Sequence, residues 1–241
     1  MQPAALLATV PASTAALIAS ARAAGVDAPV PSCEGWRTHD LVAHTAGVYR
    51  FVTAVLATGG PVSRKTLPSA PDGDEVFDDL AAASQAVIQA IEAAGPEGEA
   101  WNWAGEPPTA AFWHRRMAHE AAVHAVDAQL AAGHTPAMDP ELAGDGIDEL
   151  LTVLVPRFVA ARTDGIDTLG TLHVHCTDTA GEWLVEPSGD TVSVRREHAK
   201  GDAALRGQAL DLLLRLYNRS DGGDVVGDAG VMDRWRELVR F

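Results

Sequence analysis

Titratable side chains crowd the otherwise alanine-rich segment between residues 113 and 127. Glu120 and His124 are four residues apart, so on an α-helix they lie about 40° apart on one face and can share one ion. His119 and His124 diverge by about 140° and cannot easily do so. The zinc-protease motif HExxH places its histidines one residue closer together. The spacing therefore favours a metal pair of Glu120 and His124 over a metalloprotease site.

A third ligand has to come from another part of the chain. His44 lies in the middle of an expected helix, among small and apolar residues. Asp127 follows His124 by three positions, shares its face and could orient the imidazole by accepting its second N–H bond. Two histidines and one carboxylate leave a coordination position open, which is typical of a catalytic site. Zn²⁺ is the first expectation, and the ion could activate either water or a thiol.

Ordinary structural roles compete with these assignments. A glutamate and a histidine four residues apart can simply form a solvated helix pair. His44 alone is more often a hydrogen-bonded core histidine than a ligand. His114 and His119 point away from the Glu120 face, so we expect them at the surface or in hydrogen bonds.

Two further groups lie in the last third of the chain. His173 and His175 are two residues apart on an expected strand and hence on one face, where they could bind metal or belong to an ordinary sheet face or domain contact. Arg206 and Arg219 could hold a substrate carboxylate, or they could form surface ion pairs. Nothing in the neighbouring residues decides between these interpretations.

Apolar residues at helical spacing predict the helices that must position His44, Glu120 and His124. We expect helices over residues 4–24, 38–59, 74–94, 109–132 and 140–161. His44 lies on the second of these helices, and Glu120 and His124 lie on the fourth. Pro11 is expected to kink the first helix. Residues 60–73 are rich in Pro, Ser and Gly, which predicts a surface loop long enough to act as a lid.

After Gly165 the pattern changes from helical to alternating. Strands are expected over residues 171–177, 182–186 and 191–196, in a small antiparallel sheet, and helices over residues 209–217 and 231–239. We therefore predict an α+β fold with two domains: a metal-binding helical bundle over residues 1–165 and a small α/β domain over residues 166–241.

Charge and cysteine content narrow the range of partners and compartments. The net charge of −15, without a run of Lys or Arg, disfavours nucleic acid as a partner. Cys33 and Cys176 form no CxxC pair, which favours a reducing cytoplasm. The apolar N-terminal segment lacks a basic start and is broken by Pro11, and no uninterrupted apolar run reaches about 18 residues. We expect neither a signal peptide nor a membrane span.

Three sequence passages occur in a fixed order, and their joint occurrence is a more specific signal than any one of them alone. Residues 35–47 are similar to the pattern W-x-x-x-D-L-x-x-H-x-x-G, and residues 113–127 to R-x-x-x-E-x-x-x-H-x-x-D. The third passage comprises residues 172–183, 205–207 and 212–219. Together they resemble the mycothiol-dependent maleylpyruvate isomerase family, part of the wider DinB-like metal-binding superfamily.

This resemblance implies a DinB-like four-helix bundle, with up-down-down-up topology, that carries the metal, and a small C-terminal α/β domain. It implies His44, Glu120 and His124 as ligands of Zn²⁺ or another divalent metal, and mycothiol as the thiol cofactor or cosubstrate. Arg219 becomes the expected catalytic and cofactor-binding arginine, which would recognise an anionic group. Asp127 would fix the His124 tautomer at the cofactor site.

Relatives of this kind include isomerases, which add the thiol to an activated double bond, and transferases, which conjugate it to electrophiles. The resemblance does not choose between them. The expected partners are a small-molecule thiol and a small electrophilic substrate. Two alternatives stay open: a metal-dependent hydrolase with activated water, and a non-catalytic protein that binds metal or a small molecule. Fe²⁺, Ni²⁺ or Mn²⁺ could occupy the same ligands.

Overall fold

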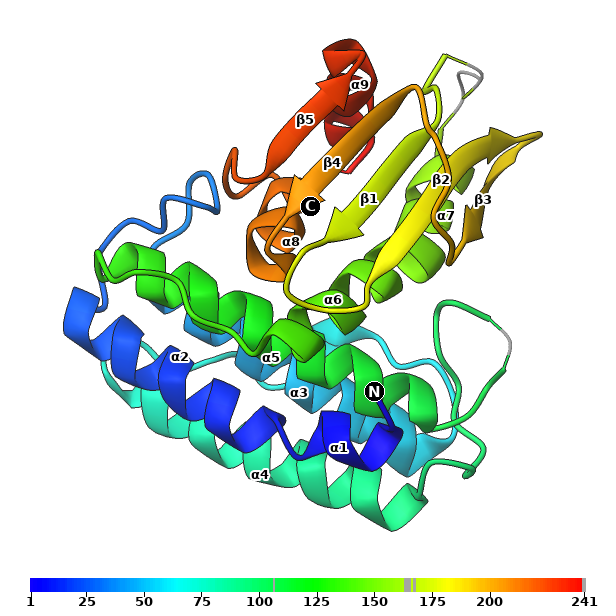
Figure 1. Ribbon diagram of the computed structural model, residues 1–241. Coiled ribbons are helices and arrows are strands. Elements are labelled where there is room, and N and C mark those ends of the chain that lie inside the picture. Colours follow the sequence, from blue (N-terminus) through cyan, green and yellow to red (C-terminus); the bar gives the residue numbers. More distant parts are fainter. Residues whose placement is uncertain (106, 163–165, 167, 240–241) are drawn as a thin grey trace. The chain divides into compact units, whose positions relative to one another are not determined.

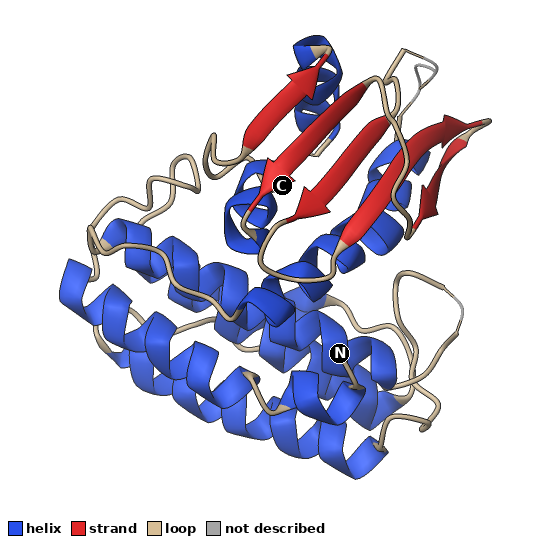
Figure 2. Ribbon diagram, in the orientation of Figure 1, coloured by secondary structure: helices blue, strands red, loops and turns tan. Residues whose placement is uncertain are grey.

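The computed structural model describes residues 1–105, 107–162, 166 and 168–239, and it divides into two compact units. The first unit comprises Met1–Ala137 and the second Met138–Phe241. Among the described residues, the first unit is built from helices, whereas the second combines strands and helices (Figure 2). The expected α+β class is confirmed.

The first unit contains a bundle of helices close to the expected ranges (Figure 1). They are α1 (Pro3–Leu7), α2 (Val10–Ala24), α3 (Thr38–Thr58), α4 (Glu75–Ala94) and α5 (Ala111–Ala131). The first expected helix is broken rather than kinked, because Pro11 lacks an N–H and fits only the first turn of α2. The loop after α3 contains one short 3₁₀ turn, Arg64–Thr66.

Four long helices enclose the core of this unit. Helix α2 packs against α4 and α5, and α3 packs against the same two helices. Each helix contributes an apolar stripe that faces the others, as amphipathic bundle helices do. The fully buried residues of this core include Leu17, Leu41, Leu80 and Met117. This packing fixes α3 and α5 side by side, and these two helices carry the candidate metal ligands.

Two segments of the bundle, Pro3–Ala24 and Thr38–Thr58, are long and apolar enough to cross a membrane by length and composition alone. Core helices of soluble proteins pass the same test. Leu17 in the first segment and Val42 in the second have no exposed surface. Packing within the bundle therefore accounts for the buried apolar residues of both segments.

The second unit begins with a helical rod and continues with a sheet and two further helices (Figure 1). The rod consists of α6 (Pro140–Glu149), a π-helical turn (Leu150–Leu154) and α7 (Val155–Ala160). The strands are β1 (Leu172–Cys176), β2 (Glu182–Ser188), β3 (Thr191–Arg195), β4 (Ala203–Gly207) and β5 (Asp224–Gly227), and the later helices are α8 (Ala209–Leu216) and α9 (Ala229–Leu238).

The five strands form one sheet in the order β3-β2-β1-β4-β5. The expected antiparallel arrangement holds for the first three strands, but β1 and β4 are parallel and β5 returns antiparallel to β4. Leu172 and Val174 of β1 are fully buried, and the alternation of a strand places His173 and His175 on the opposite face. Figure 1 shows α7, α8 and α9 behind the sheet.

The boundary between the units lies earlier than the sequence pattern indicated. We expected it near Gly165, which itself lies outside the described residues, but the chain divides between Ala137 and Met138. The reason is that α6 packs against α8, and α7 against β3, rather than joining the bundle. Residues 140–160 therefore belong to the second unit.

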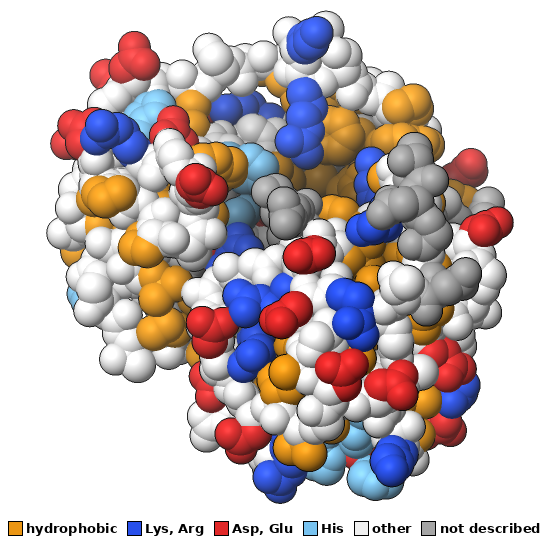
Figure 3. Space-filling model, turned by 90° about the horizontal axis from the view of Figure 1, so that it is seen from above, with side chains coloured by type: hydrophobic (Ala, Val, Ile, Leu, Met, Phe, Trp, Pro, Cys, Tyr) orange, Lys and Arg blue, Asp and Glu red, His pale blue; other side chains and the backbone are white. Residues whose placement is uncertain are grey.

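Charged side chains of both signs lie on the face drawn in Figure 3. On the face drawn in Figure 3, acidic side chains are interspersed with lysines and arginines. The net charge of the chain is −15.

Candidate metal centre

Helices α3 and α5 bring together the side chains of His44, Glu120 and His124. The Nε2 atom of His44 lies 3.2 Å from Oε1 of Glu120, and Nε2 of His124 lies 3.4 Å from the same oxygen. One ligand atom from each of the three residues lies within 4.8 Å of the other two. The two histidine rings meet edge to face, with their centroids 5.2 Å apart. The three groups expected to share an ion thus converge on one point.

The second oxygen of Glu120 has a separate partner. One guanidinium N–H of Arg116 donates to Oε2 at 3.2 Å, from one helical turn earlier on α5. This arrangement leaves Oε1 facing the two imidazoles. The Arg116 side chain is only 9% exposed, and its acidic partner is the candidate ligand itself.

The charges of this cluster depend on one another. Burial alone would raise the pKa of Glu120, but the charge and hydrogen bond of His124, the hydrogen bond of His44 and the charge of Arg116 hold it well below its usual value. Burial lowers the pKa of His124, yet the charge of Glu120 and the contact with Asp127 raise it to about 9. Without an ion, a proton on His124 balances Glu120. A bound cation would take the place of that proton.

Asp127 fixes the orientation of the His124 ring. Its Oδ2 lies 2.9 Å from Nδ1 of His124, which leaves Nε2 directed at Glu120. The Asp127 side chain is completely buried. Its other oxygen accepts a hydrogen bond from the Ser32 hydroxyl at 2.6 Å, and the Cys33 thiol lies 3.7 Å from Oδ2. Such a carboxylate–histidine pair is the usual support of a metal-binding imidazole.

An aromatic ring covers the cluster from the segment before α3. The centroid of Trp36 lies 4.9 Å from that of His44 and 6.4 Å from that of His124. A backbone hydrogen bond from Val30 to the Trp36 carbonyl holds the segment in place. The sequence argument from spacing did not assign roles to Trp36, Ser32 or Arg116. Trp36 stood in a quoted motif, but its contact with His124 depends on how the helices pack.

The remaining histidines of α5 lie away from the cluster. His114 and His119 are both buried rather than at the surface. The Nδ1 atom of His114 lies 2.9 Å from the carbonyl oxygen of Ala110, one turn earlier, so this residue forms a hydrogen bond within its own helix. The angular argument from the sequence thus agrees with a cluster that contains His124 and not His119.

Arg219 lies in the second unit, shortly after α8. Its guanidinium donates to the carbonyl of Tyr217 at 3.0 Å and lies 5.3 Å from the centroid of the Tyr217 ring. Arg206, the other arginine considered for an anionic ligand, is exposed on β4. The recognition role of Arg219 stays a prediction.

The donor set fits a divalent metal. Two imidazoles and one carboxylate are ligands that Zn²⁺ accepts, and three protein ligands leave a position for a further group. The supporting contacts of Asp127 and Arg116 hold two of the three ligands in orientation. The cluster can therefore bind a cation and present it to a small molecule.

Comparison with known proteins gives matches along nearly the whole chain. Residues 7–129 match the family model described as the mycothiol maleylpyruvate isomerase N-terminal domain, and residues 141–236 match that of the C-terminal domain. Two crystal structures of the mycothiol-dependent maleylpyruvate isomerase, one a histidine-to-alanine mutant, share the fold. The TM-score is 0.63 for the mutant and 0.54 for the other, each at 14% identity over 95% of both chains. No curated protein sequence matches significantly.

Proposed function

Because the chain belongs to the mycothiol maleylpyruvate isomerase family, we propose that it is a divalent-metal enzyme that uses mycothiol on a small electrophilic substrate. Family membership makes the chain an enzyme of the isomerase and transferase class. Zn²⁺ is the proposed ion, and maleylpyruvate, the compound named for the relatives, is the first substrate to test. The thiol and the electrophile are the proposed partners, and the cytoplasm is the proposed location.

The observation that carries this proposal is the convergence of two imidazole nitrogens on one carboxylate oxygen. His44 and His124 each direct Nε2 toward Oε1 of Glu120, at 3.2 and 3.4 Å. A solvated helix pair, the competing interpretation, would not require a third residue from α3. It would also not require a buried aspartate behind His124.

Each residue of the chain has a definite task in this proposal. His44, Glu120 and His124 hold the ion. When bound, the ion lowers the pKa of a coordinated thiol and so supplies a thiolate nucleophile at neutral pH. Asp127 keeps the Nδ1 proton of His124 in place, so that Nε2 keeps its lone pair for the metal. Trp36 covers the two histidine rings and limits the access of water to them.

Arg219 is the proposed recognition residue for an anionic group on the thiol or on the substrate. Arginine suits this task because its planar guanidinium can pair with a carboxylate through two parallel hydrogen bonds. Its contacts with Tyr217 restrict the side chain before any ligand binds. Substitution of Arg219 by Lys should therefore raise KM for an anionic substrate more than it lowers kcat.

The proposed function can be tested by elemental analysis and activity on the same preparations. The full chain is purified without chelator, together with His44→Ala, Glu120→Gln and the control His134→Ala. His134 is exposed and lies outside the cluster. Each preparation is assayed for metal content and for conversion of maleylpyruvate with and without mycothiol.

We expect wild type and the control to retain metal and to convert substrate only when the thiol is present. Each cluster variant should lose about one equivalent of metal and its activity. Thiol-independent turnover would point to a hydrolase instead, and bound metal without any product to a binding protein. Equal metal content in wild type and both cluster variants would rule out the proposed site.

A further inference from the structure

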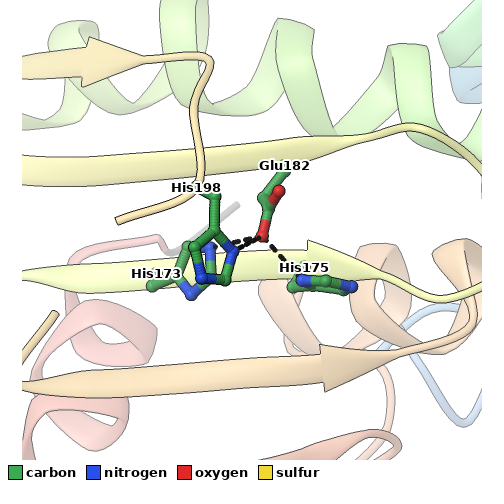
Figure 4. Close-up of side chains that lie close together, drawn as sticks. All are labelled: His173, His175, Glu182 and His198. Atoms are coloured by element: carbon green, nitrogen blue, oxygen red, sulfur yellow. Dashed lines mark hydrogen bonds and ion pairs between the residues drawn. The ribbon is translucent and has the colours of Figure 1, made fainter. Parts of the chain in front are cut away.

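A second group of metal-binding side chains lies on the sheet of the second unit, outside the bundle cluster. His173 and His175 come from β1, Glu182 comes from β2, and His198 comes from the segment between β3 and β4 (Figure 4). None of these residues belongs to the candidate centre on α3 and α5. The sequence left His173 and His175 between a metal site and an ordinary sheet face, and it did not single out Glu182 or His198.

The register of the sheet explains why three of these residues meet. His173 and His175 lie on the same face of β1 because they are two residues apart. His175 pairs directly with Glu182 across the antiparallel β1–β2 ladder. Directly opposed residues have their Cβ atoms about 5 Å apart, which places a glutamate within reach of both histidines. Strand pairing thus brings together three of the four residues, and the segment between β3 and β4 supplies the fourth, His198.

The four side chains converge on one atom. Oε1 of Glu182 lies 3.0 Å from Nε2 of His173, 2.7 Å from Nδ1 of His175 and 2.5 Å from Nδ1 of His198. The three imidazole planes are nearly perpendicular to one another, at 86° to 89°. A carboxylate oxygen has about two lone pairs, so three imidazole donors exceed what one oxygen can accept. Hydrogen bonding alone therefore accounts poorly for this arrangement.

The segment that carries His198 is anchored at both ends. Arg196 donates two hydrogen bonds to Asp148 of α6, at 2.6 and 2.9 Å, and the indole N–H of Trp183 donates to the same carboxylate at 2.8 Å. At the other end, the backbone N–H of Asp202 donates to the hydroxyl of Thr171 at 2.7 Å. These contacts hold His198 over the sheet even though its own side chain is 77% exposed.

We propose that His173, His175, Glu182 and His198 form a second binding site for a divalent transition metal, with Zn²⁺ as the first candidate. Three imidazoles and a carboxylate are donors that Zn²⁺ accepts in tetrahedral geometry. Ligand atoms in such a site are about 3.3 Å apart, and the four ligand atoms here lie within 4.8 Å of one another. Small movements of the side chains therefore suffice to admit the ion, and the exposed ring of His198 leaves a path from solvent.

The consequence of this site is structural. The ion would join β1, β2 and the β3–β4 segment, which are separated in the sequence by up to 25 residues between His173 and His198. With four protein ligands the coordination shell of zinc is complete, unlike the three-ligand centre in the bundle. The proposed role is to fasten the β3–β4 segment to the sheet rather than to react with substrate.

A zinc count on the full-length protein tests this proposal independently of the enzyme mechanism. Wild type, His198→Ala, His198→Cys and the control His134→Ala are dialysed against buffered Zn²⁺, and bound zinc is measured per chain. His198 is the safest ligand to replace because it is exposed and lies outside the strands. Cysteine is included because a thiolate can replace an imidazole as a zinc ligand.

His198→Ala should hold one zinc fewer than wild type at a free concentration that saturates wild type, and His198→Cys should restore it. This difference is expected whether or not the bundle centre binds metal, so failure of one site is not mistaken for failure of the other. In wild type alone, Zn²⁺ should slow amide hydrogen exchange at residues 197–201. Equal zinc content in wild type and His198→Ala, or zinc-independent exchange in wild type, would overturn the proposal.

Discussion

The two nitrogens of the His124 ring have different partners, and this difference defines what each one can do. Nδ1 lies 2.9 Å from buried Asp127, and Nε2 lies 3.4 Å from Glu120. The carboxylate of Asp127 therefore selects the tautomer in which Nε2 carries a lone pair. In the proposed site, the function of His124 as a ligand would therefore depend on a residue that does not itself touch the ion.

Replacing Asp127 by Asn should weaken zinc binding at the bundle centre by about 10–100-fold. The amide keeps the size of the side chain but loses the charge that holds the Nδ1 proton of His124. Competition with a chromophoric chelator gives the affinity, and circular dichroism checks the fold. Ser32→Ala is the matched control, since it removes one hydrogen bond to Asp127 without changing the charge. Unchanged affinity in Asp127→Asn would contradict the proposed support of His124.

The sequence predicted those residues of the candidate site that lie close together on one helix. Glu120, His124 and Asp127 lie on consecutive turns of one helix, so their common face follows from helical geometry. Ser32 contacts Asp127 from 95 positions away in the chain, and Trp36 reaches His124 through the packing of the bundle. Neither contact leaves a periodic signal. Arg116 lies four residues before Glu120, just as His124 lies four residues after it. The contact between Arg116 and Glu120 could therefore have been predicted from helical spacing.

Among the elements, α2 depends on its buried stripe against α5. Leu17 of α2 has no exposed surface. We expect Leu17→Ala to lower the free energy of unfolding by about 2–5 kcal/mol, because it removes buried apolar volume and leaves a cavity. Urea denaturation followed by circular dichroism measures the change. Val226→Ala is the control, because Val226 is 63% exposed and its truncation should cost less than about 0.5 kcal/mol.

The stability of the protein should depend on pH through Asp202, which lies in the connection between β3 and β4. Backbone and side-chain hydrogen bonds from Thr171 hold the pKa of the Asp202 carboxyl below its usual value of 3.8. A lowered pKa in the folded state stabilises the protein above the unfolded value, and this contribution is lost as the pH falls through the folded value. Asp202→Asn should therefore be less stable than wild type near neutral pH.

The difference in stability between wild type and Asp202→Asn should shrink as the pH falls from about 4 through the lower pKa of folded Asp202, because the carboxyl group becomes uncharged over that range. Urea denaturation of the two proteins between about pH 7 and the lowest pH at which both remain folded gives the comparison. A difference that stays constant across this range would show that the charge of Asp202 has no part in it.

The helices were predictable from the sequence, whereas two of the strands were not. Apolar residues at helical spacing mark α3, α4 and α5 over many turns each. Strand β5 has only four residues and no buried one, so it offers no alternation to detect. It exists because β4 presents a free edge for pairing. The pairing of distant segments is a tertiary effect, and a short exposed strand does not encode it.

For the whole molecule, the position of the domain boundary makes a direct prediction about fragments. A fragment of residues 138–241 should fold, because it contains every element that packs in the second unit. A fragment of residues 166–241 should be unfolded or aggregated, because loss of α6 and α7 exposes the apolar face of α8 and one end of the sheet. Circular dichroism and amide hydrogen exchange distinguish the two cases. A well-folded fragment 166–241 would restore the boundary near residue 165.

The general architecture, a helical bundle followed by a sheet domain, was predictable because the long helical pattern of the first part of the chain gives way to alternation after residue 165. The assignment of residues 140–160 was not, because an apolar stripe shows that a helix packs without showing against what. The family matches agree with the division in the structure. The match to the N-terminal domain ends at residue 129, and the match to the C-terminal domain begins at residue 141. The compact units separate between Ala137 and Met138.

The π-helical turn at Leu150–Leu154 resolves an angular mismatch in the rod that α6 and α7 form. Buried residues recur at four-residue intervals along this rod, at Leu142, Gly146, Leu150 and Leu154. Each four-residue step overshoots a full α-helical turn by about 40°, so a purely α-helical rod would wind its apolar stripe away from the sheet. One wider turn takes up the excess. Deleting a single residue there would rotate α7 against α6 by about 100° and expose Val155 and Val159, with every remaining side chain unchanged.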